Sequence, residues 1–367
     1  MAACIGLVEF SLRCCIANAP QLELDLYRFD ESGNLALKPS IRRRHVSPFW
    51  DVTIETNSWG RRDHDRPAGL SAQVILGLGD SFGFGWGVEL EQSFLSLLER
   101  DLSASKPVRL IKAAVPGTGT SDQYRLMSAL LSSVEPDLVL VNIFIGNDFI
   151  DVAHGGAEQF RVEDGLLIRG ASTEGEADGL RRGLARRVRL LQALRAVQFN
   201  LSRADETAVG PRTWDGWMRE FAQVHLKQPT KRTEEAFRQT IGILDQMAAR
   251  CEAADSQLAL VLLPRSWQVY SGELKDLMAA LEISETDLDL DRPQRTLIDW
   301  GDERGIPVVD VLARFRREAS GTAGAKLYFT PDSHMTPAAH EIVAQTALGP
   351  VLALLEKDPS GPASRAN

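Results

Sequence analysis

The residues most capable of chemistry are a serine, an asparagine and an Asp–His pair, each in a short polar block. Ser81 lies in Gly-Asp-Ser, directly after the apolar run 74–78. Asn147 lies in Gly-Asn-Asp after another apolar run, and one residue separates Asp332 from His334 near the C-terminus. A serine hydroxyl is barely ionised at neutral pH. Acyl transfer through Ser81 therefore needs a base, a group that orients the base, and donors for the oxyanion.

The turn that carries Ser81 is rich in glycine, with Gly79 before it and Gly83, Gly85 and Gly87 after it. Glycines let the backbone bend sharply and let a substrate approach closely. In open α/β sheets, ligands bind at the C-terminal ends of the strands, where this turn is predicted to lie. The alternative is an ordinary strand-to-helix turn in which Ser81 only caps the next helix.

His334 is the strongest candidate for the base because it lies beside Asp332 and just before the last predicted helix. Asp332 would accept a hydrogen bond from one ring nitrogen and so fix the tautomer. Asp310, at the end of a predicted strand, is the alternative orienting group. His340 is expected to pack or cap within the closing helix. The remaining histidines lie in segments without other catalytic signals: His45, His64, His154 and His225.

Four blocks follow one another in a fixed order: residues 79–81, GDS; residues 113–120, AAVPGTGT; residues 146–148, GND; and residues 329–340, FTPDSHMTPAAH. In their order and placement they resemble the SGNH (GDSL-type) family of esterases and acyltransferases, over roughly residues 53–355. Many members have Asp-x-x-His in the last block, whereas this chain has Asp-Ser-His. That spacing is similar to a variant found in bacterial envelope-associated and glycan-acetylating relatives.

The resemblance implies a role for each block. Ser81 would be the nucleophile, His334 the base and Asp332 the orienting carboxylate. The oxyanion would be stabilised by the backbone N–H groups of Ser81 and Gly117 and by the side-chain amide of Asn147. Gly119 is the alternative to Gly117, because the PGTG run offers two glycines. Residue 112 is a lysine where the family often has asparagine.

The function implied is that of a serine esterase acting on small acyl esters, such as acetyl esters, through an acyl-enzyme. The substrate could be an acylated carbohydrate. A second interpretation is an O-acyltransferase that modifies a glycan or envelope polysaccharide, since both reactions use the same acyl-enzyme. A third is a non-catalytic carbohydrate-binding module on the same fold.

Apolar runs alternate with helical patterns from residue 74 onward, which predicts a doubly wound, flavodoxin-like parallel sheet of about five strands in a three-layer α/β domain. Strands are expected at 74–79, 108–115, 137–145, 257–264 and 306–311. Helices are expected near 94–102, after Ser121, over 231–254 and from Pro337 onward, a residue tolerated in the first helical turn.

The predicted organisation is an N-terminal arm over 1–72, a main domain formed by 73–150 and 231–356, an insertion over 151–230, and a flexible tail over 357–367. Residues 54–63 of the arm are read as β-rich or as a plain loop. The insertion should contain helices, including a basic one near 180–200, because so long a structureless loop is improbable in a compact domain. Trp214, Trp217 and Phe221 follow that helix. The insertion either shapes substrate choice or decorates the periphery.

Composition narrows the range of partners. The 367 residues carry a formal net charge of −9 with 44% hydrophobic residues, so a basic face for nucleic acid is not expected. Neither a phosphate-binding P-loop nor an H-E-x-x-H metal motif occurs. The four cysteines show no zinc spacing and do not predict a disulfide framework: Cys4, Cys14, Cys15 and Cys251. No metal or cofactor is implied.

The first 18 residues are mildly apolar but are interrupted by Glu9 and Arg13. This run is too short to span a bilayer and lacks the basic start of a signal peptide. It is similar to the end of the N-terminal anchor of some family members, and a short amphipathic helix is the alternative. The expectation is a soluble chain as written, with peripheral membrane association as one option. A periplasmic or membrane-anchored protein is expected if the true start lies upstream.

Overall fold

The computed structural model describes residues 24–47, 49–65, 72–169, 216–320, 326–330 and 332–356. Four features predicted from the sequence lie outside these residues: the apolar N-terminal segment, the basic helix near 180–200, Trp214, and the tail at 357–367. Everything below refers to the described part of the chain.

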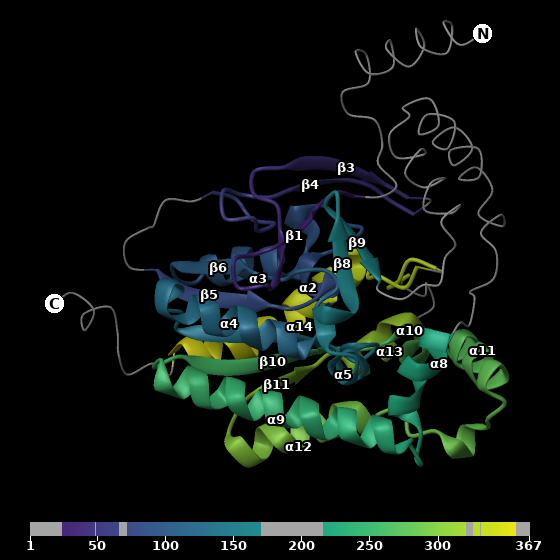
Figure 1. The fold of residues 1–367 in the computed structure, drawn as a ribbon. Coiled ribbons are helices and arrows are strands. Elements are labelled where there is room, and N and C mark those ends of the chain that lie inside the picture. Colours follow the sequence, from purple (N-terminus) through teal and green to yellow (C-terminus); the bar gives the residue numbers. More distant parts are fainter. Residues whose placement is uncertain are drawn as a thin grey trace, which may run out of the picture.

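A five-stranded parallel sheet forms the centre of the molecule (Figure 1). Its strands are β5 (Gln73–Leu78), β6 (Val108–Lys112), β7 (Leu138–Phe144), β10 (Gln257–Leu263) and β11 (Val308–Asp310). All seven residues of β7 are buried. Continuous apolar strands of this kind are expected where helices cover both faces of a parallel sheet. The predicted fold class is therefore confirmed.

The order of the strands, β11-β10-β7-β5-β6, is that of a flavodoxin-like sheet. The first strand, β5, has β6 on one side and β7 on the other, with Leu76 opposite both Ile111 and Val139. The chain thus leaves β5 in one direction and later returns to its other side. Such a switch point leaves a crevice beyond the C-terminal ends of the two central strands. Ser81 follows the end of β5, and Asn147 follows the end of β7.

Helices cover the two faces of the sheet (Figure 1). One face packs against α3 (Phe94–Ser103), α13 (Leu312–Ser320) and α14 (Pro337–Glu356). The other face packs against α4 (Thr120–Val134), α5 (Asp148–Ala153), α9 (Lys231–Ala253) and α12 (Arg292–Arg304). Each apolar cluster contains side chains from several strands, so the sheet has a separate hydrophobic core on either side.

The start of α4 differs from the prediction. Ser121 is not the residue before the helix, because the helix already begins at Thr120 and its N-cap is Gly119. Asp122 closes this helix start by accepting a hydrogen bond from the Gly119 N–H at 3.0 Å. A carboxylate three residues after the cap therefore satisfies the N–H of the cap residue itself.

In the described residues, α14 is the one helix whose length and apolar composition would suffice to cross a membrane. It begins at Pro337, as predicted. Half of its apolar window is buried within the molecule, where Val343, Ala347 and Val351 belong to the core cluster shared with α3. Its hydrophobicity is thus that of a core helix in this fold.

The segments outside the sheet add hairpins and short helices. Two hairpins precede β5, namely β1 (Tyr27–Phe29) with β2 (Leu35–Leu37) and β3 (Arg42–Val46) with β4 (Asp51–Glu55). A third consists of β8 (Phe160–Glu163) and β9 (Leu166–Arg169), and it lies near the first two in Figure 1. The short helices are α2 (Ser81–Phe84), α8 (Gly216–Ala222), α10 (Ser266–Val269) and α11 (Ser271–Leu281).

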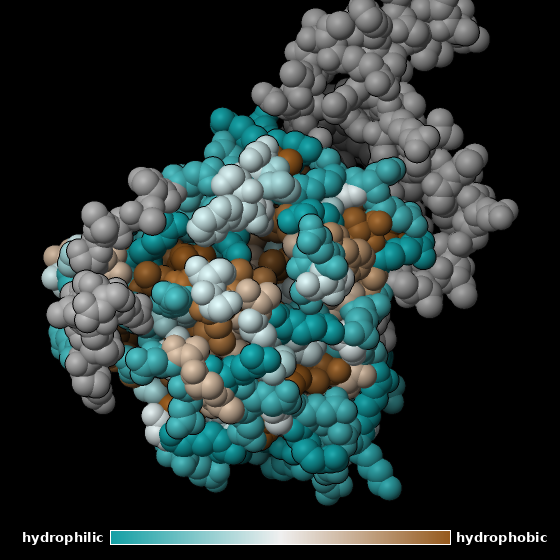
Figure 2. All heavy atoms as spheres, turned by 60° about the vertical axis from the view of Figure 1, so that its left-hand side comes forward, coloured by the Kyte–Doolittle hydropathy of each residue, from teal (hydrophilic) through white to brown (hydrophobic). Residues whose placement is uncertain are grey.

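The surface of the molecule on the side where the strands begin is mostly hydrophilic, with apolar side chains in small separate groups (Figure 2).

The N-terminal arm contributes a small core of its own above the strand ends. Leu26, Leu37 and Ile54 are fully buried there together with Phe84 and Ala114 of the central domain. The arm therefore shares a hydrophobic core with the loop that follows Ser81.

A buried ionic cluster also links the arm to the sheet. Lys112 lies at the end of β6. Its Nζ is 2.7 Å from Glu99 Oε2 in α3 and 3.1 Å from Asp63 Oδ1 in the arm. All three side chains are almost completely buried. Removing one charge from such a cluster is costly because the others lose their partner.

We expect Lys112→Met to lower the free energy of unfolding by about 3–5 kcal/mol, since two buried carboxylates would lose their cation. Urea denaturation followed by circular dichroism measures this change. Arg100→Met is the matched control, because Arg100 is an exposed residue of the neighbouring helix that pairs with Asp101. Equal midpoints for the two variants would contradict the assignment.

Candidate active site

The strand β5 ends in a tight turn that exposes Ser81 as the first residue of the short helix α2. Asp80 is the N-cap, and its carboxylate accepts a hydrogen bond from the Phe82 N–H at 2.8 Å. Capping is thus done by Asp80, and the Ser81 hydroxyl is left for other contacts. A Cβ on Gly79 would lie 3.0 Å from the Cβ of Asn142, so glycine lets this turn pack closely on β7.

The Asp-Ser-His block forms a compact turn before α14. Ser333 has a positive φ of 75°. This brings Asp332 Oδ1 to 3.1 Å from the backbone N of His334 and to 2.5 Å from its ring Nδ1. One carboxylate oxygen therefore accepts from both the backbone and the ring of His334. A left-handed residue between the two is what allows the short spacing to support this contact.

His334 contacts a residue far from it in the sequence. Its Nε2 lies 2.9 Å from the Oγ of Ser81. Since Nδ1 donates its proton to Asp332, Nε2 is left as the acceptor for the serine hydroxyl. The imidazole also packs against the ring of Phe82, with 5.0 Å between ring centroids. The structure thus brings Ser81, His334 and Asp332 into one hydrogen-bonded chain.

The electrostatics of the pair favour a charged carboxylate. Burial raises the pKa of Asp332, but the charge and hydrogen bonds of His334 outweigh burial and hold this pKa below its ordinary value. Asp332 therefore stays ionised at neutral pH. An ionised carboxylate beside Nδ1 stabilises the imidazolium that forms when the base accepts a proton.

The two glycines proposed as alternative oxyanion donors differ in environment. The N–H of Gly119 already donates to Asp122 at the start of α4. Gly117, with φ of 85°, lines the same cavity as Ser81 and His334. A Cβ at Gly117 would lie 2.6 Å from the side-chain end of Leu167 in β9, and the positive φ itself favours glycine here. This arrangement favours Gly117 over Gly119.

Asn147 is the residue before α5 and also lines the cavity. Its side-chain Nδ2 donates to Asp151, which lies one helical turn further on. An amide nitrogen carries two hydrogens, so one can be held by Asp151 while the other is offered to a ligand. Asp151 was not predicted from the sequence, although its i, i+4 spacing from Asn147 on a helix was a signal for it.

The cavity around Ser81 is small, with a volume of about 190 Å³. Aromatic side chains form much of its wall: Phe82, Phe144, Phe160 and Phe221. Phe160 comes from β8 and Phe221 from α8, both in the segment predicted as an insertion. Arg265, which follows β10, also lines it and lies over the ring of Phe144 at 5.5 Å. The predictions for the site did not include Phe160 and Arg265.

The alternative candidates lie elsewhere. Asp310 accepts a hydrogen bond from the Leu312 N–H at 3.0 Å, so it caps α13, and it does not line the cavity. His340 accepts from the Phe94 N–H at 3.2 Å and packs between α14 and α3. His225 is buried beside Trp267, and His154 pairs with Glu220. His64 is 3.4 Å from Glu91 at the surface.

His45 lies closer to the site than the sequence suggested. It is buried in β3, and its Nδ1 accepts a hydrogen bond from Trp50 Nε1 at 3.1 Å. Its ring also contacts Trp86, which in turn lies 6.1 Å from the ring of His334. Burial lowers the pKa of His45 to about 4, against the opposing charge of Asp332. His45 is therefore a neutral ring that packs, through Trp86, behind the pair formed by Asp332 and His334.

Two carboxylates lie buried beneath Ser81. Burial raises the pKa of Asp80 to about 6, although the hydrogen bond from Phe82 N–H opposes this. Burial and the charges of Asp80 and Asp151 raise the pKa of Asp148 well above its ordinary value. Asp148 accepts a hydrogen bond from the Phe144 N–H at 2.9 Å and so holds the end of β7. Both residues therefore hold backbone N–H groups close to Ser81 and Asn147 in the sequence.

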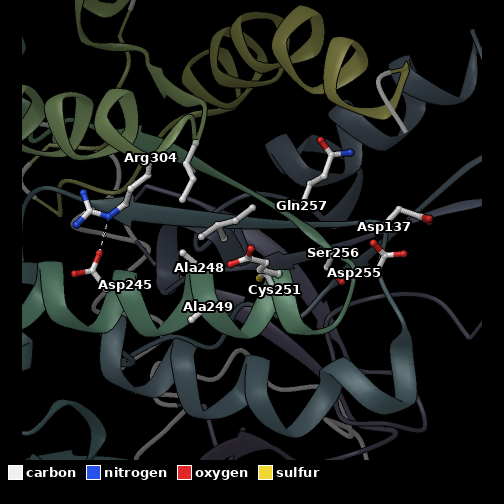
Figure 3. A pocket seen from close by; sticks show the side chains of 12 residues that line it. Asp137, Asp245, Ala248, Ala249, Cys251, Asp255, Ser256, Gln257 and Arg304 are labelled. Atoms are coloured by element: carbon white, nitrogen blue, oxygen red, sulfur yellow. Dashed lines mark ion pairs between the residues drawn. The ribbon is translucent and has the colours of Figure 1, made fainter. Parts of the chain in front are cut away.

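A larger hollow of about 750 Å³ lies at the opposite edge of the sheet, where the strands begin (Figure 3). It is lined by α9 and by the residues that precede β7 and β10, including Asp137 and Ser256. Arg304 and Asp245 pair across it at 2.7 Å. Cys251 is buried in its floor, where burial raises the pKa of the thiol to about 12. Neither Ser81 nor His334 lines this hollow.

Comparison with known proteins gives likenesses of structure alone. No protein-family model matches the chain, and no curated protein matches it. Among solved structures, the acetyl xylan esterase AlAXEase is 11% identical, with 76% of this chain and 99% of that chain covered and a TM-score of 0.43. A G-D-S-L family lipolytic protein from Veillonella parvula DSM 2008 is also 11% identical, with 76% and 97% covered and a TM-score of 0.40.

A two-domain esterase active on acetylated mannans, co-crystallised with mannopentaose, is 13% identical. The match covers 79% of this chain and 52% of that chain, with a TM-score of 0.42. At such identities and TM-scores the activity has to be argued from the geometry of the site itself.

If Asp332 orients His334, Asp332→Asn should lower kcat for ester hydrolysis more than tenfold, or about 1.4 kcal/mol in the barrier. The base would remain but would be poorly held and often in the wrong tautomer. Asp310→Asn is the control, because Asp310 caps α13 away from the cavity. The assignment is wrong if Asp310→Asn is the crippling change and Asp332→Asn is nearly silent. Kinetics of both variants, with folding checked by circular dichroism, decide between them.

The buried carboxylate of Asp148 should make stability depend on pH. An unfolded aspartate loses its proton near pH 4, whereas folded Asp148 holds its proton to higher pH. The wild type therefore loses stability as pH rises above about 4 and through the folded pKa. The free energy of unfolding of Asp148→Asn, relative to that of wild type, should therefore be larger at pH 8 than at pH 5. Urea denaturation of both proteins at pH 5 and at pH 8 measures this difference. Exposed Asp302→Asn should show no such gain, and a flat difference for Asp148→Asn would refute the assignment.

Proposed function

We propose that this protein is a serine esterase that cleaves small acyl esters through an acyl-enzyme on Ser81. The observation that carries the proposal is the continuous contact from Ser81 Oγ to His334 Nε2, and from His334 Nδ1 to Asp332 Oδ1. A nucleophile, a base and an orienting carboxylate within hydrogen-bond reach form the arrangement that serine acyl transfer requires.

In the first half of the reaction, Ser81 Oγ attacks the ester carbonyl while His334 Nε2 takes the hydroxyl proton. The imidazolium that results faces Asp332. The carbonyl oxygen becomes an oxyanion, for which the N–H groups of Ser81 and Gly117 and the amide of Asn147 are the proposed donors. Collapse of the tetrahedral intermediate breaks the ester C–O bond, and His334 returns its proton to the leaving alcohol.

In the second half, water or another hydroxyl attacks the acyl-enzyme. His334 takes the proton of this nucleophile, a second tetrahedral intermediate forms, and its collapse returns the proton to Ser81. The product is a free acid if water attacks and a new ester if an alcohol attacks. The same residues serve both outcomes, so access of the acceptor decides between hydrolysis and transfer.

The small cavity supports a short acyl group. Typical sites for drug-sized ligands have volumes of about 300–1,000 Å³, whereas this one has about 190 Å³. Phe160 and Phe221 form part of its wall. An acetyl group is the acyl group that we propose.

For the alcohol half of the ester we propose a carbohydrate. Polar groups share the cavity with the aromatic wall, among them Asn147, Asp151 and Ser333. Such groups can bind the hydroxyls that surround an ester on a sugar ring. Transfer of the acyl group to a glycan hydroxyl is an outcome of the test below.

The test uses purified wild type, Ser81→Ala and a panel of p-nitrophenyl esters from acetate to octanoate. Wild type should turn over acetate best and be labelled by a fluorophosphonate, while Ser81→Ala should fold but show neither activity. Full labelling of Ser81→Ala would show that another residue is the nucleophile, and no labelling of wild type would favour a binding module. Repeating the assay with glycan acceptors distinguishes transfer from hydrolysis by mass spectrometry of the acceptor.

A further inference from the structure

The loop that follows Ser81 is held by a residue from outside the central domain. Arg62 lies in the N-terminal arm and is only 2% exposed. Its Nη1 donates to the backbone carbonyls of Phe84 at 3.0 Å and Gly85 at 2.6 Å. Its Nη2 donates to the carbonyls of Val88 at 2.6 Å and Thr53 at 3.2 Å. Three of these four acceptors belong to residues 84–88, the turn that follows Ser81.

This turn needs support because its backbone is unusual. Gly85 and Gly87 both have positive φ, at 77° and 86°. Glycine loses more conformational freedom on folding than any other residue, so a turn with two such glycines is costly to order. A planar guanidinium with donors in a fixed fork can fix several carbonyls at once, whereas a lysine ammonium has no such preset geometry.

The turn is hydrogen-bonded to the backbone of Ser81 and of the residue that follows it. The Trp86 N–H donates to the carbonyl of Ser81 at 3.0 Å, and the Gly85 N–H donates to the carbonyl of Phe82 at 3.2 Å. Trp86 lies between Gly85 and Val88, whose carbonyls Arg62 binds. Fixing these two carbonyls therefore fixes the N–H that holds the backbone of the serine.

Strand β4 completes the connection. The N–H of Thr53 donates to both carboxylate oxygens of Glu89, at 3.0 and 3.2 Å, while its carbonyl accepts from Arg62. Two residues of the arm thus hold this part of the chain: Arg62 binds the carbonyl of Val88, and Thr53 binds the carboxylate of Glu89. Arg62 also lies over the ring of Phe84 at 4.9 Å. Burial lowers the pKa of Arg62 to about 10, so it stays charged at neutral pH.

We propose that Arg62 is a positioning residue for catalysis, which holds the turn 84–88 so that Ser81 is aimed at His334. The N-terminal arm is then part of the catalytic apparatus. This inference rests on the proposed function for its kinetic consequence, but the holding of the turn can be measured without a substrate.

The kinetic test compares Arg62→Gln and Arg62→Lys with wild type, using kcat per active site titrated with a fluorophosphonate. Misplacement of a reacting group by about 1 Å can cost a hundredfold, so we expect per-site kcat to fall by about tenfold to a hundredfold in Arg62→Gln. Arg62→Lys should fall less, because it keeps the charge and loses the fork. KM should change little, since Arg62 does not line the cavity.

A purely structural role would give a different result. It would lower the fraction of sites that titrate and leave kcat per titrated site as in wild type, which would overturn the proposal. Arg43→Gln is the matched control. Arg43 is an arginine of the same arm that pairs with Asp25 at 2.5 Å, and this variant should keep wild-type kcat per site.

Amide hydrogen exchange supplies the readout that does not depend on activity. The N–H groups of Gly85, Trp86 and Val88 should exchange faster in Arg62→Gln, or in Arg62→Lys if the first variant does not fold, while those of β7 stay protected. Unchanged exchange in the turn would overturn the proposal. If the Arg62 variants exchange faster in the turn but wild type shows neither ester turnover nor labelling, the proposed function is refuted. The holding of the turn by Arg62 is then still established.

Discussion

The site depends on a contact between residues 253 positions apart in the chain, Ser81 Oγ and His334 Nε2, which lie 2.9 Å from each other. A hydrogen bond of this kind weakens steeply with distance and misalignment, so both residues must be fixed by their own surroundings. Ser81 is fixed at the end of β5 by the Asp80 cap and by the packing of Gly79 on β7. His334 is fixed by the turn at Ser333 and by the closing helix α14.

The sheet supplies the common frame for these two supports. Because β5 lies between β6 and β7, the turn after β5 opens at the point where the connections diverge to opposite faces of the sheet. The helix α14 packs across one face against α3, and this packing delivers the Asp332–His334 turn to the same edge. The loop after β7 brings Asn147 there as well. The parallel arrangement of the strands thus gathers separate blocks of the sequence at one place.

Segments outside the central sheet pack around the site. The arm shares a core with the loop after Ser81 and attaches to it through Arg62, whose guanidinium binds four carbonyls. The hairpin β8–β9 and helix α8 place Phe160 and Phe221 in the cavity wall. The two terminal nitrogens of this buried cation donate to four carbonyls, which offsets part of its loss of water, although its Nε has no partner among the described residues. The periphery therefore contacts the turn that follows Ser81 and forms part of the cavity wall.

The sequence by itself determined the sheet and the chemical groups. Apolar runs alternating with helical patterns indicated five strands, because each buried strand must be apolar on both faces. Local motifs predicted Ser81, Asn147, Asp332 and His334 as site residues, since glycine-rich turns and short polar blocks can be found in the sequence itself. The start of α4 was misplaced: the helix was expected after Ser121 but begins at Thr120, with Gly119 as its N-cap.

Only the tertiary structure decided which groups meet. Asp332 rather than Asp310 contacts His334, and Gly117 rather than Gly119 lines the cavity, while the N–H of Gly119 donates to Asp122. His45, Phe160 and Arg265 could not be assigned to the site from the sequence, because each reaches it through contacts between segments distant in the chain. Such contacts depend on distances in space, which local patterns of residue type do not encode.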